Sequence, residues 1–304
     1  MRLTNKHELA VFELGADRAN GIAPLVELIK PEYGIITNVG KAHLQGFGSF
    51  ENVVKTKGFL YDYLKDIPNS RIFYHEDDKL LSKMLSDRKI TNTFSYSAEN
   101  NHHSLVSGKI ISNKQFVEFE WYRKESPDTK YNVQTHLVGS YNLPNLMAAI
   151  SVGVYFKINP NEICEALEGY IPSNNRSQLQ QTDKNILIID TYNANPKSMR
   201  AALDNFYEFE SQCGYKKMMI LGDMAELGES SFEEHKSIVE YLIESGFDNV
   251  WLVGEMFSKV ESPFRKFQNV EEVKESLLSE NTNHFTILIK GSNSTKLYEL
   301  PDYL

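Results

Sequence analysis

The sequence has few cysteines and no long apolar run. Its two cysteines, Cys164 and Cys213, show neither CxxC nor metal-ligand spacing, which argues against a disulfide framework and predicts free thiols in a reducing compartment. No stretch of about 18 apolar residues occurs, so we expect no membrane span. The first residues, MRLTNKHE, lack the apolar core of a signal peptide. Together these absences predict a cytoplasmic protein.

Basic residues are outnumbered by acidic ones. The chain has 32 Lys and Arg against 41 Asp and Glu, which gives a formal net charge of −9. A nucleic-acid partner is not expected, because a phosphate backbone binds to a basic surface. Small anionic substrates remain compatible with this charge, since a local group of Lys, Arg and helix N-termini can bind them. The length of 304 residues allows two domains.

Apolar runs and helical patterns alternate in the first part of the chain. Residues 9–14 and 33–39 are expected to be buried strands, and residues 22–29 and 50–64 are expected to be helices. Strands that alternate with helices are typical of a mostly parallel sheet. The sequence therefore predicts an α/β fold.

Residues 70–138 differ from this pattern and are expected to form several short strands with polar breaks. Pro127 and Asp128 are expected to form a turn between two of them. Helices are predicted over residues 143–156 and 161–170. The polar, turn-rich segment 171–177 is the best candidate for a domain boundary.

Beyond this boundary the alternation of strands and helices is regular. Strands are predicted at 186–189, 218–221, 250–253 and 286–289. Helices are predicted at 198–210, 232–244 and 270–278. We therefore expect a first domain over residues 1–173 and a Rossmann-like, doubly wound domain of about four main strands over residues 174–304.

Polar residues follow the aliphatic run 186–189 without a gap. In open α/β sheets, ligands bind at the carboxyl ends of the strands. Asp190, Tyr192, Asn193 and Asn195 would therefore lie where a ligand can be held. The alternative is that these residues are ordinary turn formers, since Asp and Asn are common in turns.

Glu13 and His43 follow the first two predicted strands in the same way. A carboxylate and an imidazole at neighbouring strand ends suit a magnesium ion that also binds water and substrate phosphates. Lys57 lies on the predicted helix that follows. The alternative is that His43 is a capping or core residue and Lys57 a surface charge.

Five further positions are candidates for a functional role, and most of them also have a structural interpretation. Asn142 and Asn145 open the helix at 143–156, where carboxamides can read the edge of a heterocycle or simply cap the helix. Arg176 can clamp a phosphate across a domain cleft or lie on the surface. Lys290 ends the last strand as a possible partner for a substrate carboxylate, and His235 is either a ligand contact or exposed.

Several motifs, taken together and in order, resemble the Mur ligase family. They are FELGA at 12–16, ITNVGKAHLQGFGS at 36–49, TKG at 56–58, GSYNLPN at 139–145, NRSQ at 175–178, DTYNANP at 190–196, LGDMAELG at 221–228 and KGS at 290–292. Most of these motifs are weak individually, but the ordered set covers nearly the whole chain. It is most similar to the branch that joins D-alanyl-D-alanine to UDP-N-acetylmuramoyl-tripeptide.

The resemblance implies an ATP-dependent amide ligase of peptidoglycan synthesis that works through an acyl-phosphate. It implies a central ATP-binding domain, here incomplete, whose mostly parallel sheet carries added antiparallel strands. The last domain would be Rossmann-like. ATP and Mg²⁺ would be the cofactors, and the muramoyl tripeptide and D-alanyl-D-alanine the substrates.

The resemblance also implies roles for individual residues. Glu13, His43 and a carbamylated Lys57 would hold magnesium near the reacting groups. Asn142 and Asn145 would contact adenine. The phosphates and ribose would be contacted by Arg176, Asp190 and Tyr192. The incoming dipeptide would be contacted by Asn193, Asn195, Lys290 and Ser292.

One family motif is absent from this sequence. The family has a phosphate-binding loop G-x-x-x-x-G-K-[ST] upstream of the strand with Glu13, but Gly40-Lys41 is followed by Ala42, and Gly108-Lys109 by Ile110. We therefore expect a partial ligase that is inactive alone and whose incomplete sheet exposes an unpaired edge. The alternatives are half of a split ligase completed by a separate chain, or a non-catalytic nucleotide- or dipeptide-binding module.

Overall fold

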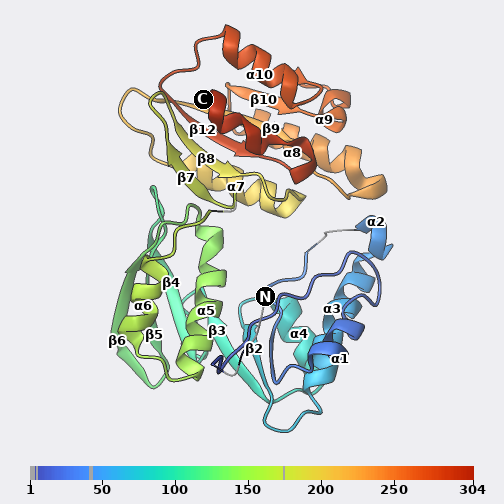
Figure 1. Cartoon of the computed structure of the whole chain (residues 1–304), viewed down its shortest axis with the longest axis vertical. Helices are drawn as coiled ribbons and strands as arrows, with labels where there is room; N and C mark the ends of the chain where they lie inside the picture. Colours follow the sequence, from blue (N-terminus) through green and yellow to red (C-terminus); the bar gives the residue numbers. More distant parts are fainter. Residues whose placement is uncertain (1–3, 5, 41–43, 174) are drawn as a thin grey trace.

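Two sheets, each flanked by helices, are joined in the middle of the chain (Figure 1). The computed structural model describes residues 4, 6–40, 44–173 and 175–304. Both sheets are mostly parallel and both have helices on each face, which confirms the predicted α/β fold. Among the helices of these residues, none is long and apolar enough to cross a membrane.

The first sheet has the strand order β1-β2-β3-β4-β5-β6 within the described residues. The strand bounds are β1 Tyr33–Ile35, β2 Arg71–His75, β3 Thr93–Ser97, β4 Val106–Ser112, β5 Glu118–Arg123 and β6 Ser126–Gln134. The pairs from β1 to β4 are parallel, whereas β5 pairs antiparallel with both β4 and β6. Antiparallel strands are therefore added at one end of a parallel sheet.

Helices cover both faces of the first sheet. One face packs against α1 (Ala23–Ile29), α3 (Phe50–Leu64) and α4 (Lys79–Asp87), and the other against α5 (Leu143–Tyr155) and α6 (Pro160–Glu168). The short helix α2 (Leu44–Phe47) precedes α3. Ser49 caps α3 by accepting a hydrogen bond from the Asn52 N–H.

The second sheet has the order β11-β10-β9-β12-β8-β7, and only β7 is antiparallel within the described chain. The strand bounds are β7 Gln178–Gln181, β8 Ile186–Asp190, β9 Lys216–Gly222, β10 Val250–Val253, β11 Arg265–Phe267 and β12 Phe285–Lys290. The helix bounds are α7 Pro196–Glu208, α8 Ser231–Glu244, α9 Glu255–Lys259 and α10 Val270–Ser279. α7, α8 and α9 pack on one face, whereas α10 and the C-terminal 3-10 turn Leu297–Tyr303 pack on the other.

The strand predicted at residues 9–14 is not formed. These residues are irregular, and Leu9 and Val11 are 50% and 78% exposed. Residues 9–14 pair with no strand of the described sheet, and β1 is left as its edge strand. A strand is stable only when its backbone groups are paired. The predicted strand at 33–39 is shorter than expected, since only Tyr33–Ile35 pairs with β2.

The turn predicted at Pro127 and Asp128 is also wrong. Both residues lie inside β6, and the chain reverses at Lys124 and Glu125 instead. β6 is the last strand of its sheet, and proline is tolerated on such an edge because one side of the strand needs no backbone donor. Helix α4 and the short strands β7 and β11 were not predicted, so the second sheet has two more strands than the main four expected.

Two buried polar side chains near the amino ends of β8 and β12 predict opposite effects on stability. Asn185 accepts a hydrogen bond from the Phe285 N–H (2.9 Å) and donates one to the Leu304 carbonyl (2.7 Å). The Thr286 hydroxyl has no partner among the described residues. We expect Asn185→Ala to lower the free energy of unfolding by roughly 1–3 kcal/mol, because it leaves the Phe285 N–H unpaired and removes one of the hydrogen bonds to the Leu304 carbonyl. We expect Thr286→Val to change it by less than about 0.5 kcal/mol.

Urea unfolding followed by Trp251 fluorescence in a Trp121→Phe background measures both effects, since these are the two tryptophans of the chain. Trp251 lies in the second sheet. Equal losses for Asn185→Ala and Thr286→Val would contradict this account of the two side chains.

Candidate functional site

The start of α5 and the segment before β7 meet where the two sheets join. The Asn142 amide donates hydrogen bonds to the Val138 carbonyl (2.9 Å) and to Ser177 Oγ (3.1 Å). The Tyr141 hydroxyl lies 3.0 Å from the same Ser177 oxygen. Burial, and the negative charge of Asp190, raise the pKa of Tyr141 well above its usual value. Tyr141 is therefore neutral and lies close enough to Asp190 to sense its charge.

Ser177 has an unusual backbone conformation at this junction. Its φ is 49° and that of Asn175 is 57°, both in the left-handed region that costs an L-residue about 1 kcal/mol or more. The Ser177 carbonyl accepts a hydrogen bond from the Val138 N–H (3.3 Å). Contacts to both its side chain and its backbone therefore stabilise this strained conformation.

Arg176, between these two residues, is exposed and faces the turn that follows β8. Its guanidinium lies 3.6 Å from the centre of the Tyr192 ring, and the Thr191 N–H donates to the Asn175 carbonyl at 2.9 Å. A guanidinium that stacks on an aromatic ring keeps its N–H groups available at its edge. The structure thus brings Arg176 and Tyr192 together, next to Asp190.

The other residues predicted on this turn have structural contacts. Asn195 caps α7 in a capping box with Ser198. Asn193 is exposed, and its carbonyl accepts a hydrogen bond from Lys290 Nζ at 3.4 Å. Lys290 also forms a 2.6 Å ion pair with Asp190, and its side chain is 1% exposed.

The asparagines at the start of α5 differ from each other. Asn142 occupies the N-cap position, but its side chain makes no capping hydrogen bond, so the capping interpretation of Asn142 is wrong. Its two amide hydrogens bind Val138 and Ser177, which leaves its carbonyl oxygen as an acceptor. Asn145 is exposed one turn further along the helix.

The predicted metal residues are only partly visible. Glu13 is exposed in the irregular segment before α1, and His43 lies outside the described residues. Lys57, on α3, is half-buried and donates a hydrogen bond to the Asn38 carbonyl at 2.9 Å. Burial lowers the pKa of Lys57. Among the described residues no three His, Cys, Asp or Glu side chains form a metal site, so the visible donor set does not by itself fit magnesium.

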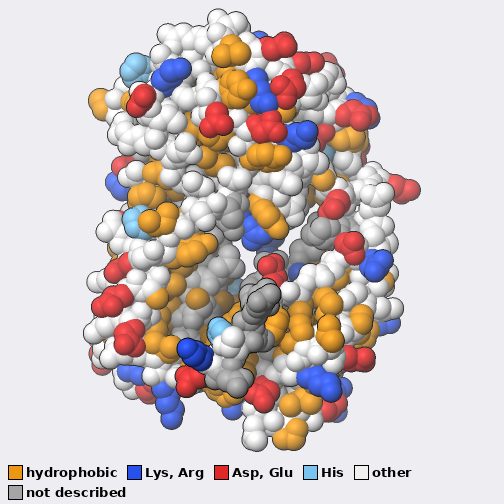
Figure 2. Space-filling model, viewed as in Figure 1, with side chains coloured by type: hydrophobic (Ala, Val, Ile, Leu, Met, Phe, Trp, Pro, Cys, Tyr) orange, Lys and Arg blue, Asp and Glu red, His pale blue; other side chains and the backbone are white. Residues whose placement is uncertain are grey.

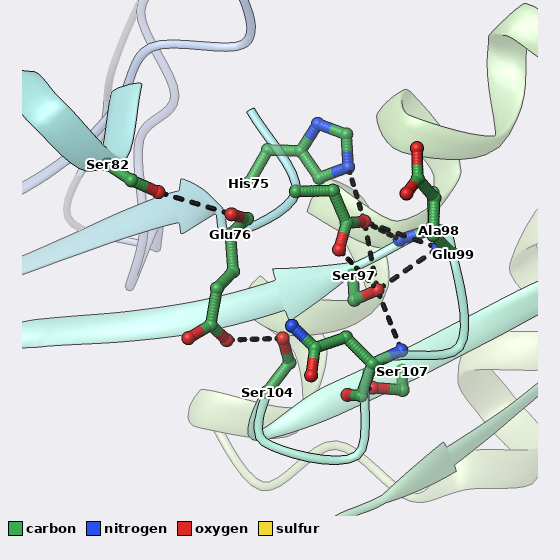
Figure 3. Close-up of polar contacts among 10 residues, drawn as sticks. His75, Glu76, Ser82, Ser97, Ala98, Glu99, Ser104 and Ser107 are labelled. Atoms are coloured by element: carbon green, nitrogen blue, oxygen red, sulfur yellow. Dashed lines mark hydrogen bonds and ion pairs between the residues drawn. The ribbon is translucent and has the colours of Figure 1, made fainter. Parts of the chain in front are cut away.

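A polar cluster that the sequence did not predict lies at the carboxyl ends of β2 and β3 (Figure 3). The Asp77 carboxylate accepts hydrogen bonds from the Ser97 hydroxyl (2.9 Å) and the Ala98 N–H (2.8 Å), and lies 3.0 Å from His75 Nε2. Nearby, the Ser104 hydroxyl donates to Glu76. The Asp77 carboxylate is thus bound by donors of the protein itself. We interpret the cluster as a structural one that connects the ends of β2 and β3.

His235 and Asp223 form a second unpredicted arrangement, at the carboxyl end of β9. His235 Nε2 accepts a hydrogen bond from the Met224 N–H (3.0 Å), and Nδ1 donates to the Ser231 carbonyl (2.6 Å), which fixes the tautomer. The Asp223 carboxylate accepts from the Met256 and Phe257 N–H groups, each at 2.9 Å. His235 is fully buried, so it is not the exposed residue that one interpretation of the sequence allowed.

The turn after β9 lies opposite the first sheet. A Cβ added at Gly228 would lie 4.0 Å from Gln45 Cα on α2, so the two halves of the molecule approach each other there as well as at Ser177. Figure 2 shows a hollow between the upper part of the molecule, formed by the second sheet, and the lower part. The strand-end turns of the second sheet therefore face the other half of the protein.

Comparison with known protein families identifies the family of this chain. A family model described as the Mur ligase middle domain matches residues 1–153, and one described as the Mur ligase, glutamate ligase domain, matches residues 175–293. The chain belongs to the Mur ligase family.

Two relatives within the family match this chain over nearly its full length and have the same name. The UDP-N-acetylmuramoyl-tripeptide–D-alanyl-D-alanine ligase of Buchnera aphidicola is 31% identical over 100% of this chain and 66% of that protein. The Bacillus subtilis enzyme of the same name is 30% identical over 96% of this chain and 63% of its own length. This chain thus spans just under two thirds of the length of these relatives.

Solved structures agree with the sequence relatives. The crystal structure of MurF from Acinetobacter baumannii superposes with a TM-score of 0.84 at 27% identity, covering 99% of this chain and 65% of that one. MurF from Thermotoga maritima in complex with ADP has a TM-score of 0.80 at 22% identity, over 95% of this chain and 65% of that one. The second likeness shows a shared fold.

The buried imidazole of His235 predicts a pH effect on stability. Burial lowers its pKa, so below its usual pKa of about 6.5 an unfolded chain takes up a proton that the folded chain resists. Its contribution is therefore present above about pH 6.5 and is lost as the pH falls. We expect the free energy of unfolding to fall more steeply between about pH 6.5 and 5 in the unsubstituted chain than in His235→Gln.

Denaturant unfolding at a series of pH values measures this difference in slope. His103→Gln, which replaces an exposed histidine of the first half, is the matched control. If the free energy of unfolding falls with pH in parallel for the unsubstituted chain and His235→Gln, burial does not lower the pKa of this imidazole.

Proposed function

We propose that this chain supplies the nucleotide-binding and acceptor-binding parts of an ATP-dependent ligase that joins D-alanyl-D-alanine to UDP-N-acetylmuramoyl-tripeptide. The observation that carries this proposal is the junction at which Asn142 and Ser177 meet beside Arg176, Asp190 and Tyr192. Names of the curated relatives support the same substrates, and a MurF structure in complex with ADP supports the nucleotide.

The contacts at the junction suit the parts of a nucleotide. The carbonyl oxygen of Asn142, which has no partner among the described residues, can accept a hydrogen bond from the amino group of adenine, with the exposed Asn145 amide one turn away. The Arg176 guanidinium, supported by the Tyr192 ring, can bind a phosphate. Asp190 offers carboxylate oxygens to ribose hydroxyl groups.

The proposed reaction has two steps. The tripeptide carboxylate attacks the γ-phosphorus of ATP, and the bond to the β-phosphate oxygen breaks to give an acyl-phosphate and ADP. The amine of D-alanyl-D-alanine then attacks the acyl carbon, and phosphate leaves with formation of the amide and loss of a proton. The first step brings two anions together, and the second develops negative charge on the departing phosphate, so fixed cations such as Arg176 would stabilise both. Asn193 and Asn195 are proposed to lie beside the incoming dipeptide.

Lys57 is proposed to become a carbamate. A neutral lysine amine adds to carbon dioxide and releases a proton, and the lowered pKa of Lys57 increases its neutral fraction. Glu13 and the carbamate would then offer magnesium the hard oxygen donors that it prefers beside phosphates, and His43 would add a nitrogen donor. Bound magnesium would neutralise phosphate charge.

We further infer how the chain divides into domains. Residues 1–173 are proposed to be a partial central domain and residues 174–304 a C-terminal domain, with the boundary in the polar segment before β7. No segment of this sequence matches G-x-x-x-x-G-K-[ST], so we propose that the chain alone binds nucleotide without ligating. A separate polypeptide that carries such a loop would complete the enzyme.

Isothermal calorimetry with ADP tests the nucleotide role. We expect the chain to bind ADP, and Tyr192→Leu to weaken binding about threefold, because stacking of Arg176 contributes roughly 0.5–1 kcal/mol at an exposed site. Tyr192→Phe keeps the ring and is the matched control. No ADP binding by the unsubstituted chain would refute the proposal, and D-alanyl-D-alanine binding without any ADP binding would favour a dipeptide-binding module.

Nuclear magnetic resonance with ¹³C-bicarbonate tests the modification of Lys57. At a mildly alkaline pH we expect a carbamate ¹³C signal that is absent in Lys57→Arg and retained in Lys55→Arg, which replaces an exposed lysine of the same helix. A signal that survives Lys57→Arg, or no signal at any pH up to about 9, would contradict the assignment.

A further inference from the structure

The segment 290–292 lies at the carboxyl end of β12, between two strand-end turns. β12 is central in the second sheet, and Lys290 is in register with Asp190 on β8 and with Leu221 on β9. The turn 190–195 follows β8, and the turn 223–227 follows β9. Contacts of this segment therefore determine how the two turns lie relative to each other.

Lys290 binds the first of these turns. Its Nζ lies 2.6 Å from Asp190 Oδ2 and 3.4 Å from the Asn193 carbonyl. The side chain is 1% exposed, whereas Asp190 remains partly exposed. A buried ammonium group requires a paired charge and further acceptors, and this turn supplies both. The ammonium group is consequently bound by the protein, while the second oxygen of the Asp190 carboxylate has no hydrogen-bond partner among the described residues.

Ser292 binds both turns. Its Oγ accepts a hydrogen bond from the Ala225 N–H at 2.8 Å and donates to the Ala194 carbonyl at 3.4 Å. Its own N–H donates to the Asp223 carbonyl at 3.1 Å. The residue is 3% exposed, so these contacts are shielded from water. Each turn is thus held to the end of β12 by hydrogen bonds from one serine.

Gly291 allows this close approach. A Cβ at this position would lie 3.0 Å from Gly222 Cα and 2.8 Å from the Thr295 hydroxyl. Any larger residue would separate the end of β12 from the end of β9. Close packing of the ends of β12 and β9 therefore favours glycine at position 291.

We propose that Lys290 and Ser292 are positioning residues that hold the two turns in a fixed relation, and that neither touches substrate. Lys290 orients Asp190, and Ser292 fixes the turn 223–227 against the turn 190–195. This inference rests on the proposed function, in which Asp190 contacts the nucleotide. It replaces the direct dipeptide contacts expected for these two residues from the sequence.

Amide hydrogen exchange of the full chain, without ligand, tests the positioning role. We expect Ser292→Ala to speed exchange of the Ala225 amide at least tenfold, while the Met224 amide, which is bound by His235, changes less. Lys290→Met should speed exchange at Thr191 and Asn195. Thr286→Val, a buried substitution on the same strand, is the matched control and should leave all four amides unchanged.

Calorimetry with ADP distinguishes positioning from direct contact. If Lys290 acts only through Asp190, Lys290→Met weakens ADP binding about tenfold in the unsubstituted chain and has no further effect in an Asp190→Ala background. Losses that add in the double variant would overturn the proposal, as would unchanged exchange in both single variants. Absence of ADP binding by the unsubstituted chain would refute the proposed function, whereas the exchange measurement would still decide the positioning role.

If Lys290→Met does not fold, amide exchange of Ser292→Ala still tests the proposal. A melting profile of each variant by circular dichroism identifies such a failure. A uniform increase in exchange across the second sheet in Ser292→Ala, with no excess at Ala225, would show a general loss of stability and would overturn the proposal.

Discussion

The rest of the structure depends on the hydrogen bonds that fix Ser177 where the two sheets join. Its left-handed backbone is held by the Val138 N–H, and its hydroxyl by Tyr141 and Asn142. Because Ser177 is fixed, Arg176 before it lies over the Tyr192 ring, and residues from both halves of the chain converge. A left-handed residue that is not glycine persists only where its surroundings determine it, and such residues are frequent at functional sites.

The two turns of the second sheet extend this arrangement away from the junction. The turn after β8 carries Asp190 and is bound to Lys290, and the turn after β9 is bound to Ser292 and His235. Both follow parallel strands, where an open α/β sheet binds its ligands. In this chain the two turns are thus linked through residues at the end of one central strand, β12.

The sequence predicted helices and strands well where burial determines the spacing of apolar residues. Helix α3 and strand β10 have the predicted bounds, because long amphipathic and short fully apolar runs are the clearest signals. The run at 9–14 has the same apolar signal without a partner strand, which a single sequence does not reveal. The site was predicted as a set of residues, but not that Lys290 is buried or that Asn142 binds Ser177, because both facts depend on which turns meet in space.

Backbone amide exchange with and without ADP tests the central claim, that one nucleotide site is formed by residues from both halves of the chain. The account predicts that ADP protects amides in residues 139–145, 175–178 and 190–196 together, at a common ADP concentration. Protection confined to one half, or protection elsewhere with these three segments unchanged, would contradict it.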